Sequence, residues 1–456
     1  MSAVPGTAAP APARGRFAWA MFDWANQPYF TVVITFIYGP YFVTYLVGDP
    51  VQGQSLWGYT QSAAGLLIAV TAPFLGAIAD AGGPRKPWIL AFTALCIVGA
   101  GALWFGLPGA DWTMLAFIMA MVVVGTVGVE FAVVFNNAML PNLVPDDRMG
   151  RLSGFGWGLG YVGGLVALVI VLAVTLPEPP LFGLDRASQA HNRFVGPLTA
   201  VWFALFVIPM FVFTPDQPRT GLGRAAAVRA GITNLLATLG KLRQYRNIAL
   251  YLVARMIYYD GQTAIFAFGG IYAAGLFGWG TTELGLFGII ILVFGAVGCF
   301  VGGAMDDRLG SRFTVTLALI GLLIATLGVL SIGDGKVLFV VPAAMPVVDD
   351  GLFATPAEWL FIALAVLLGI SGGPAQAASR TMLARLAPRD MVGEFYGLYA
   401  LSGKATAFMA PFAVGVLTQA TDSQRGGLSI VVVFLVVGLV LLRFVHEQRT
   451  EPLTRR

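Results

Sequence analysis

Charged residues are scarce in this 456-residue chain, since Asp, Glu, Lys and Arg together make up 11% of it, whereas an ordinary soluble domain carries about 25%. Hydrophobic residues make up 57%, and the mean hydropathy is +0.80. This composition excludes a water-soluble globule. Apolar runs of roughly 20 residues, enough to cross a bilayer core in a helix, recur along the chain. The sequence therefore predicts an all-α polytopic membrane protein.

Cysteine and histidine are nearly absent. Cys96 and Cys299 lie within apolar runs, and His191 and His446 lie far apart. Such a distribution predicts no disulfide framework, metal site or histidine-based catalytic group. The glycine-rich run at 154–164 has no preceding strand, so it indicates close helix packing rather than phosphate binding. We expect no enzymatic activity, no cofactor, no metal and no nucleic-acid partner.

Charged or Pro/Gly-rich breaks divide the apolar runs into twelve predicted transmembrane helices, in two bundles of six. The predicted spans are 17–47, 56–79, 88–107, 112–136, 152–176, 198–214, 249–276, 283–304, 313–332, 359–380, 393–419 and 427–445. The bundles therefore cover 17–214 and 249–445. A polar stretch at 215–248 is predicted to be a cytoplasmic linker, and residues 1–16 and 446–456 to be tails.

Basic residues gather on one side of the predicted bundle. The loops on the side of both tails hold Arg85, Lys86, Arg148, Arg151, Arg308, Arg312, Arg385 and Arg389, and the opposite loops hold only Arg186, Arg193, Lys336 and Arg425. Because cytoplasmic loops carry the excess of Lys and Arg, we expect both termini in the cytoplasm. Only four lysines occur among 27 basic residues, a bias typical of a GC-rich bacterial genome. We expect a bacterial inner membrane.

Two loops occur twice, at equivalent places in the two halves. GAIADAGGPRK at 76–86 returns as GAMDDRLGSR at 303–312, and LVPDDRMGRLSG at 143–154 returns as LAPRDMVGEFYG at 386–397. Internal repeats of this kind are typical of secondary transporters. The sequence thus predicts a duplicated six-helix unit with pseudo-symmetric halves.

The repeated loop resembles the major facilitator superfamily signature, Gly-x-x-x-Asp-x-x-Gly-x-Arg between the second and third helices of each half. The stretches at 22–26 (FDWAN), 140–164, 254–261 (ARMIYYDG) and 394–411 resemble the vacuolar-effluxer branch, whose eukaryotic members are autophagy-related amino-acid exporters. The resemblance implies alternating access and amino-acid efflux. It also implies that spans one, four, seven and ten line a cavity. Ala81 and Gln27-Pro28 depart from the family pattern.

A cytoplasmic gate is a second implication of the signature loops. In a rocking transporter, Asp80 would accept hydrogen bonds from the helix start near 393, and Asp307 from the helix start near 152, since helix N-termini favour an anion. The candidate gate residues are Asp80, Arg85, Arg151, Asp307 and Arg312. The alternative is a set of ordinary loop charges at the membrane interface.

Five ionisable side chains fall inside the predicted spans: Asp23, Glu130, Arg255, Asp260 and Lys404. A charge at bilayer depth costs about 2.5 to 3.5 kcal/mol, so each is a functional candidate. Three acids and two bases leave one negative charge, which a bound proton or a cationic group would neutralise. We therefore expect proton coupling, with sodium as the alternative. Fixed interhelical ion pairs are the structural alternative.

Polar residues at helical spacing extend these positions into stripes. The further candidates are Asn26 and Gln27 beside Asp23, Asn137 beside Glu130, Tyr258, Tyr259 and Gln262 beside Arg255, and Gln376 in the tenth span. Pro28 cannot donate to the carbonyl of Trp24, so it should kink the first helix and free a backbone acceptor there. Asp260 lies five residues from Arg255, about 140° around the helix, so the two should not pair.

A zwitterion would need both charge signs, which Arg255 or Lys404 and Asp23 or Glu130 would supply. The sequence thus predicts a monomeric secondary transporter, coupled to protons, that moves a small polar organic solute. The alternatives are a proton-linked importer or a drug or metabolite exporter of the same fold, and a non-transporting nutrient sensor.

Overall fold

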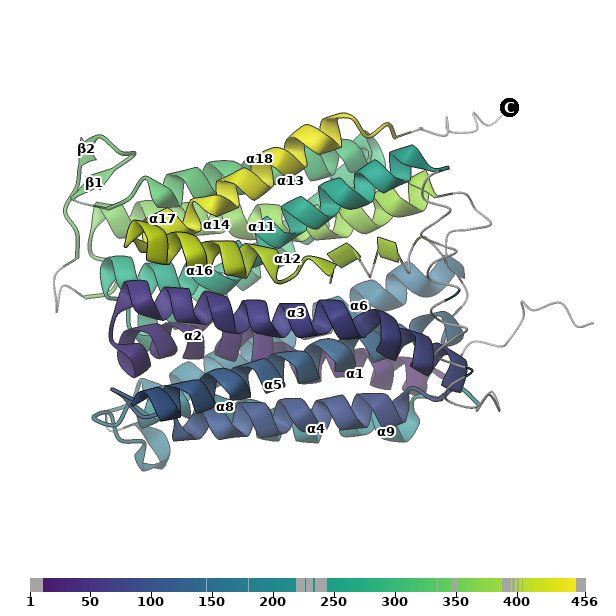
Figure 1. Ribbon diagram of the computed structural model, residues 1–456, viewed down its shortest axis with the longest axis horizontal. Coiled ribbons are helices and arrows are strands. Elements are labelled where there is room, and N and C mark those ends of the chain that lie inside the picture. The colour runs from purple at the N-terminus through teal and green to yellow at the C-terminus, as the bar shows by residue number, and fades with distance from the viewer. Residues whose placement is uncertain are drawn as a thin grey trace, which may run out of the picture.

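The computed structural model describes residues 11–447, apart from 145, 179, 219–225, 227–232, 234–243, 334, 347–350, 388–394, 396–397, 400–401 and 404. For 73–74, 76–82, 141, 146–151, 153–154, 300, 307 and 384 only the backbone is described. Long helices run beside one another (Figure 1). We call the end that carries strands β1 (Lys336–Val337) and β2 (Val341–Pro342) the hairpin end, and the opposite end the terminus end.

The first half of the chain runs back and forth between these ends. Its elements are α1 (Ala13–Pro28), η1 (Tyr29–Phe36), α2 (Tyr38–Tyr41), η2 (Phe42–Val47), α3 (Pro50–Gly82), α4 (Lys86–Ala102), η3 (Leu103–Phe105), α5 (Trp112–Asn137), η4 (Leu140–Asn142), α6 (Asp146–Thr175), η5 (Leu181–Gly183), α7 (Ala190–Arg193), α8 (Val195–Phe206) and α9 (Ile208–Phe213).

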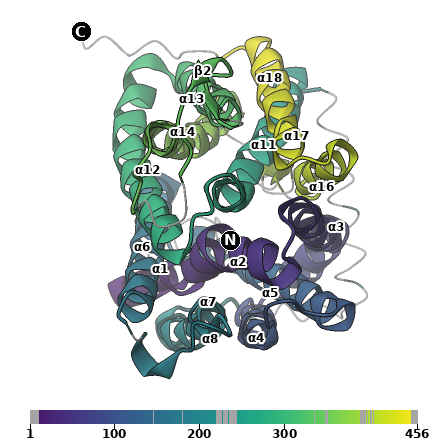
Figure 2. The ribbon, with the colours of Figure 1, turned by 90° about the vertical axis from the view of Figure 1, so that its left-hand side faces the viewer.

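The second half follows the same order of long helices. Its elements are α11 (Arg246–Phe277), α12 (Thr281–Leu309), α13 (Ser311–Leu330), β1, β2, α14 (Pro356–Leu386), α16 (Met409–Thr421), α17 (Gln424–Leu428) and α18 (Ile430–Arg443). Seen from the hairpin end, the two halves form two groups of helices, and they meet where α6 lies next to α12 and α3 next to α16 (Figure 2).

Nine helical segments of the described chain are long and apolar enough to cross a membrane. They coincide with predicted spans one, three to six, eight to ten and twelve. Helices α3 and α11, with 33 and 32 residues, cover the second and seventh predicted spans, and the eleventh lies partly outside the described residues. The all-α polytopic fold is confirmed, while the count of twelve stays a prediction.

Pro28 changes the course of the first helix, as predicted. The chain beyond it continues with the wider turns of a π-helix, which end where the amide of Ile37 donates to the carbonyl of Val32 at 3.2 Å. The carbonyl of Trp24 is not left open, however, because the indole Nε1 of Trp202 on α8 donates to it at 3.1 Å. The expected backbone acceptor therefore holds α1 against α8.

The glycine-rich run of α6 packs directly against α1, which confirms its predicted packing role. A Cβ placed on Gly163 would lie 2.8 Å from the carbonyl oxygen of Trp24, and one on Gly156 would lie 2.5 Å from Oδ2 of Asp23. Gly158 lies between these two glycines in the sequence but on another face of the helix. A Cβ added to Gly158 would have no atom within 4 Å. The glycines that face α1 therefore set how closely the two helices approach.

This pair of glycines gives a matched test of stability. Gly163→Ala should lower the melting temperature of the detergent-solubilised protein, because the new methyl group meets backbone that cannot move aside. Gly158→Ala should leave the melting temperature unchanged or raise it, since alanine is favoured over glycine in helices by about 1 kcal/mol. Equal effects of the two substitutions in a thermal unfolding assay would show that this packing does not limit stability.

Candidate functional site

Asp23 lies between α1 and α6, in the half of the bundle nearer the terminus end. The carboxylate of Asp23 lies against Gly156. A Cβ added to Gly160 would lie 3.5 Å from the Cβ of Asp23. Because these residues of α6 are glycines without side chains, the half-buried carboxyl of Asp23 has room between the two helices. Asn26, predicted to share its stripe, is buried and donates to the carbonyl of Phe22 in its own helix at 2.9 Å.

Arg380 on α14 brings a positive charge to the same place from the other group of helices. Its guanidinium carbon lies 5.1 Å from the centroid of the Trp157 ring on α6, and Trp157 directly follows Gly156, against which the Asp23 carboxylate lies. The ring of Tyr161 lies 6.2 Å from that of Trp157. Trp157 is 41% exposed, and its contact with Arg380 joins α6 of one group of helices to α14 of the other.

Arg380 is not among the candidates predicted from the sequence. It is the last residue of the predicted span 359–380, whereas α14 continues to Leu386. The available signal was the spacing of four residues from the candidate Gln376, which puts the two on one face of the helix. Both side chains are half-buried.

Arg255 on α11 is enclosed by neutral groups. Its Nη1 donates to the carbonyl oxygen of Tyr399 at 2.9 Å and to the hydroxyl of Ser402 at 3.0 Å. Its guanidinium carbon lies 3.5 Å from the ring centroid of Tyr399 and 4.8 Å from that of Tyr259. Only 7% of the residue is exposed. This arrangement ties α11 to the segment before α16.

The other residues of the Arg255 stripe connect α11 to α14. The hydroxyl of Tyr258 lies 2.6 Å from that of Ser379, and Nε2 of Gln262 donates to the carbonyl of Gly372 at 2.8 Å. These contacts hold the two helices together, so Tyr259 is the member of the stripe that remains half-buried beside Arg255.

Asp260 is buried on α11 with 3% of its surface exposed. Its Oδ2 and the Oγ1 of Thr406 are both buried, and Thr406 is the polar side chain that interacts with the Asp260 carboxyl. No ion pair joins Asp260 to Arg255 among the described residues, as the helical spacing predicts. A carboxylate buried in this way is costly when ionised, which makes Asp260 a candidate for carrying a proton.

For the remaining candidate residues the structure gives burial and few contacts. Glu130 is half-buried on α5, and Asn137 is exposed at the end of that helix, where its neighbour Asn136 is fully buried. Gln27 faces α6, with its Oε1 3.4 Å from a Cβ on Gly160. Lys404 lies outside the described residues.

At the terminus end, the predicted gate is described only in part. The side chains of Asp80, Arg151 and Asp307 lie outside the described residues. Nη2 of Arg312 donates to the carbonyl of Arg443 in its own half at 2.7 Å. The predicted meeting of the signature carboxylates with the opposite half stays a prediction.

Each half instead makes the same contact at the start of its third long helix. The Asp216 carboxylate accepts from the backbone amides of Arg85 and Lys86, at 2.8 and 3.1 Å, where α4 begins. The Glu447 carboxylate accepts from the amides of 311–312, at 3.1 and 2.8 Å, where α13 begins. Both carboxylates follow the last helix of their half, and both meet the positive end of a helix dipole.

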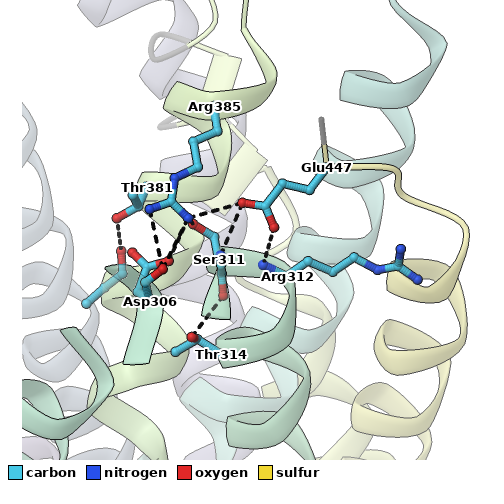
Figure 3. Close-up of polar contacts among 9 residues, drawn as sticks. Asp306, Ser311, Arg312, Thr314, Thr381, Arg385 and Glu447 are labelled. Carbon is cyan, nitrogen blue, oxygen red and sulfur yellow. Dashed lines mark hydrogen bonds and ion pairs between the residues drawn. The ribbon is translucent and has the colours of Figure 1, made fainter. Parts of the chain in front are cut away.

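Glu447 also belongs to a cluster of charges that joins three helices (Figure 3). Nη1 of Arg385 lies 3.0 Å from Oδ1 of Asp306, 3.1 Å from Oε1 of Glu447 and 2.8 Å from the hydroxyl of Ser311. Arg385 thus connects α14 to the end of α12, the start of α13 and the chain after α18. Arg385, Asp306 and Glu447 all belong to the second half, so this cluster holds one half together.

At the hairpin end the two halves are joined by uncharged contacts. Nε2 of Gln54 on α3 donates to the hydroxyl of Thr418 at 2.8 Å and to the carbonyl of Gln424 at 3.0 Å. On the other side, the hydroxyl of Thr281 on α12 is hydrogen-bonded to the side-chain oxygen of Asn192. We call these bonds the hairpin-end contacts. All five residues except Thr281 are buried, so the contacts close this end.

The structure thus has two groups of membrane-crossing helices. They are joined at one end, and they carry opposite charges near the place where they meet. This arrangement is typical of a membrane transporter. The chain belongs to the vacuole effluxer Atg22-like family, whose model matches residues 40–452. It is 28% identical over 446 residues, 96% of both chains, to YxiO, an uncharacterised MFS-type transporter of Bacillus subtilis. It is 24% identical over 313 residues to autophagy-related protein 22-1 of Neosartorya fischeri, covering 66% of this chain and 48% of that protein. The match thus spans about half the length of the fungal relative.

Solved structures show the same fold. The D-xylose–proton symporter superposes with a TM-score of 0.68 at 14% identity, covering 94% of this chain and 96% of that chain. A POT family transporter in complex with 5-aminolevulinic acid superposes with a TM-score of 0.65 at 15% identity, again over 94% and 96%. Its family and its relatives make the protein a multi-pass membrane transporter of the major facilitator type rather than an enzyme.

Proposed function

We propose that this protein is a proton-coupled secondary transporter that exports an amino acid or a similar zwitterion by alternating access. The observation that carries the proposal is the contact of Arg380 with Trp157 on α6, one residue after Gly156, against which the Asp23 carboxylate lies. A zwitterion needs an anion for its amine and a cation for its carboxylate. Here one group of helices offers the anion and the other offers the cation. The description of the family as vacuole effluxers supports the outward direction.

The proposed architecture is a monomer of twelve helices in two pseudo-symmetric bundles, with both termini in the cytoplasm of a bacterial cell. The matching contacts of Asp216 and Glu447 at the starts of α4 and α13 support the duplication. In this orientation the hairpin end faces outward. The hairpin-end contacts then close the outer side, so the described conformation is the one that loads its substrate from the cytoplasm.

Proton coupling is supported by two carboxyls in the membrane. Asp23 lies on α1 against the glycines of α6, and Asp260 is buried on α11 with 3% of its surface exposed. Uptake of one proton would neutralise either group before it moves through the membrane. Glu130 stays a candidate for the same role, Lys404 stays a candidate cation for the substrate carboxylate, and sodium stays the alternative ion.

Counterflow into proteoliposomes tests this function. Purified protein is reconstituted with a panel of unlabelled amino acids inside, and entry of the labelled compound is followed with and without a pH gradient. We expect exchange of at least one amino acid, and net accumulation only when a gradient is imposed. If no amino acid exchanges, the proposed substrate is wrong although the transporter fold stands.

A further inference from the structure

The proposed function requires a cation for the carboxylate of the substrate, and the two described candidates differ in their surroundings. Arg255 has an aromatic ring near each side of its guanidinium and spends Nη1 on two protein acceptors. A substrate carboxylate could reach it only by displacing Tyr259 or Tyr399. Its geometry therefore suits the bracing of α11 rather than ligand binding.

Arg380 lies in a different setting. It is half-buried, it rests on one face of a ring that is 41% exposed, and it comes from α14 toward the glycine-lined face of α6. The ring of Trp157 favours the guanidinium by about 0.5 to 2 kcal/mol. The planar fork of a guanidinium is suited to bidentate recognition of a carboxylate.

We propose that Arg380 binds the carboxylate of the substrate, that Trp157 positions the guanidinium, and that Asp23 binds the amine. The inference rests on the proposed function, because it names the binding groups of the same site. It assigns one named residue to each charge of a solute that carries a carboxylate and an amine together.

One consequence concerns the moving parts. Asp23 belongs to the first group of helices and Arg380 to the second, so a zwitterion bound to both connects the two groups. A solute that carries only an amine would contact Asp23 alone, and a solute that carries only a carboxylate would contact Arg380 alone. Such a solute should bind, but more weakly, and it should not drive the closure that exchange requires.

Binding to purified protein tests the assignment, measured as ligand-induced thermal stabilisation. The probes are the twenty standard amino acids, followed by the amine and the carboxylic acid that correspond to each amino acid that binds. For Arg380→Gln we expect amino-acid affinity to fall about tenfold to a hundredfold, as for the loss of a charge-assisted hydrogen bond, while affinity for the amine is unchanged. For Asp23→Asn we expect affinity for the amine to fall and affinity for the carboxylic acid to be unchanged.

Three further variants control for folding and charge. Arg308→Gln removes an exposed arginine from the end of α12 and should bind like the wild type. Arg380→Lys retains the charge but not the planar fork, so it should bind more tightly than Arg380→Gln and less tightly than the wild type. Trp157→Phe keeps a ring beneath the guanidinium and should lose less affinity than Arg380→Gln.

The outcomes separate this inference from the proposed function. Unchanged amino-acid affinity in Arg380→Gln, or equal losses for the amino acid and the amine, would overturn the role of Arg380 while amino-acid transport stands. If no amino acid binds the wild type but a simple carboxylate does, and Arg380→Gln loses it, the carboxylate site stands and the amino-acid function is wrong. If no probe that carries a carboxylate binds the wild type, both are wrong.

Discussion

Asp23→Asn should abolish accumulation driven by a pH gradient. Asparagine has nearly the shape of aspartate, so the packing of α1 against Gly156 is kept, but the amide neither binds a proton nor carries a charge. In proteoliposomes the internal substrate concentration should no longer rise above the external one, whatever gradient is imposed. The pH dependence of initial rates should disappear as well, because the titrating group is gone.

Asp111→Asn is the matched control for this prediction. Asp111 caps the start of α5, where its Oδ1 accepts from the amide of Met114 at 2.8 Å. Asparagine is as good an N-cap as aspartate, so the same chemical change outside the site should leave transport unaltered. If Asp23→Asn transports like the wild type with an unchanged pH profile, Asp23 is neither the coupling group nor a ligand.

Gly58→Leu should prevent the hairpin end from closing. A Cβ on Gly58 of α3 would lie 2.6 Å from the carbonyl oxygen of Pro411 and 3.0 Å from the backbone of Gly415, both on α16. Overpacking of this kind costs about 1 to 3 kcal/mol, and the closed conformation alone bears that cost. The turnover rate should fall about fivefold to 150-fold, and the conformational equilibrium should shift toward the outward-open form by a similar factor.

Cysteine labelling measures this shift directly. Ser55 of α3 is 4% exposed and donates only to the carbonyl of Val51 in its own helix, so Ser55→Cys reports on the hairpin end with little disturbance. After Cys96 and Cys299 are replaced, a membrane-impermeant maleimide should label this position faster in Gly58→Leu. The control is Gly269→Leu on α11, where an added Cβ would have no atom within 4 Å. In this variant the cysteine at position 55 should be labelled at the same rate as in the protein without the leucine, and transport should be unchanged. Equal labelling in all three would contradict the assigned closure.

Much of the molecule follows from local sequence. Apolar runs and the breaks between them predict the long helices to within a few residues, because a helix that crosses a bilayer must be apolar for about 20 residues. The glycines at 156, 160 and 163 recur on one face, and that face packs on α1 as predicted. Pro28 alters the helix for a reason that lies in its own backbone.

Long-range contacts are what the sequence could not supply. The open carbonyl of Trp24 is predictable, but its use by Trp202, 178 residues away, is not. The charge of Arg255 is predictable, but its enclosure by Tyr259 and Tyr399 depends on how α11 meets the segment before α16. Arg380 was missed because its importance comes from Trp157, which lies in the other group of helices.

The sequence by itself therefore determined the class of protein, the course of its helices and the scarcity of charges that makes each one in the membrane significant. These properties depend on composition and on spacing along one chain segment. Tertiary structure alone decided which charges are enclosed and which are accessible, since exposure depends on the neighbours that distant segments bring. For this transporter, that difference separates the bracing Arg255 from the accessible Arg380.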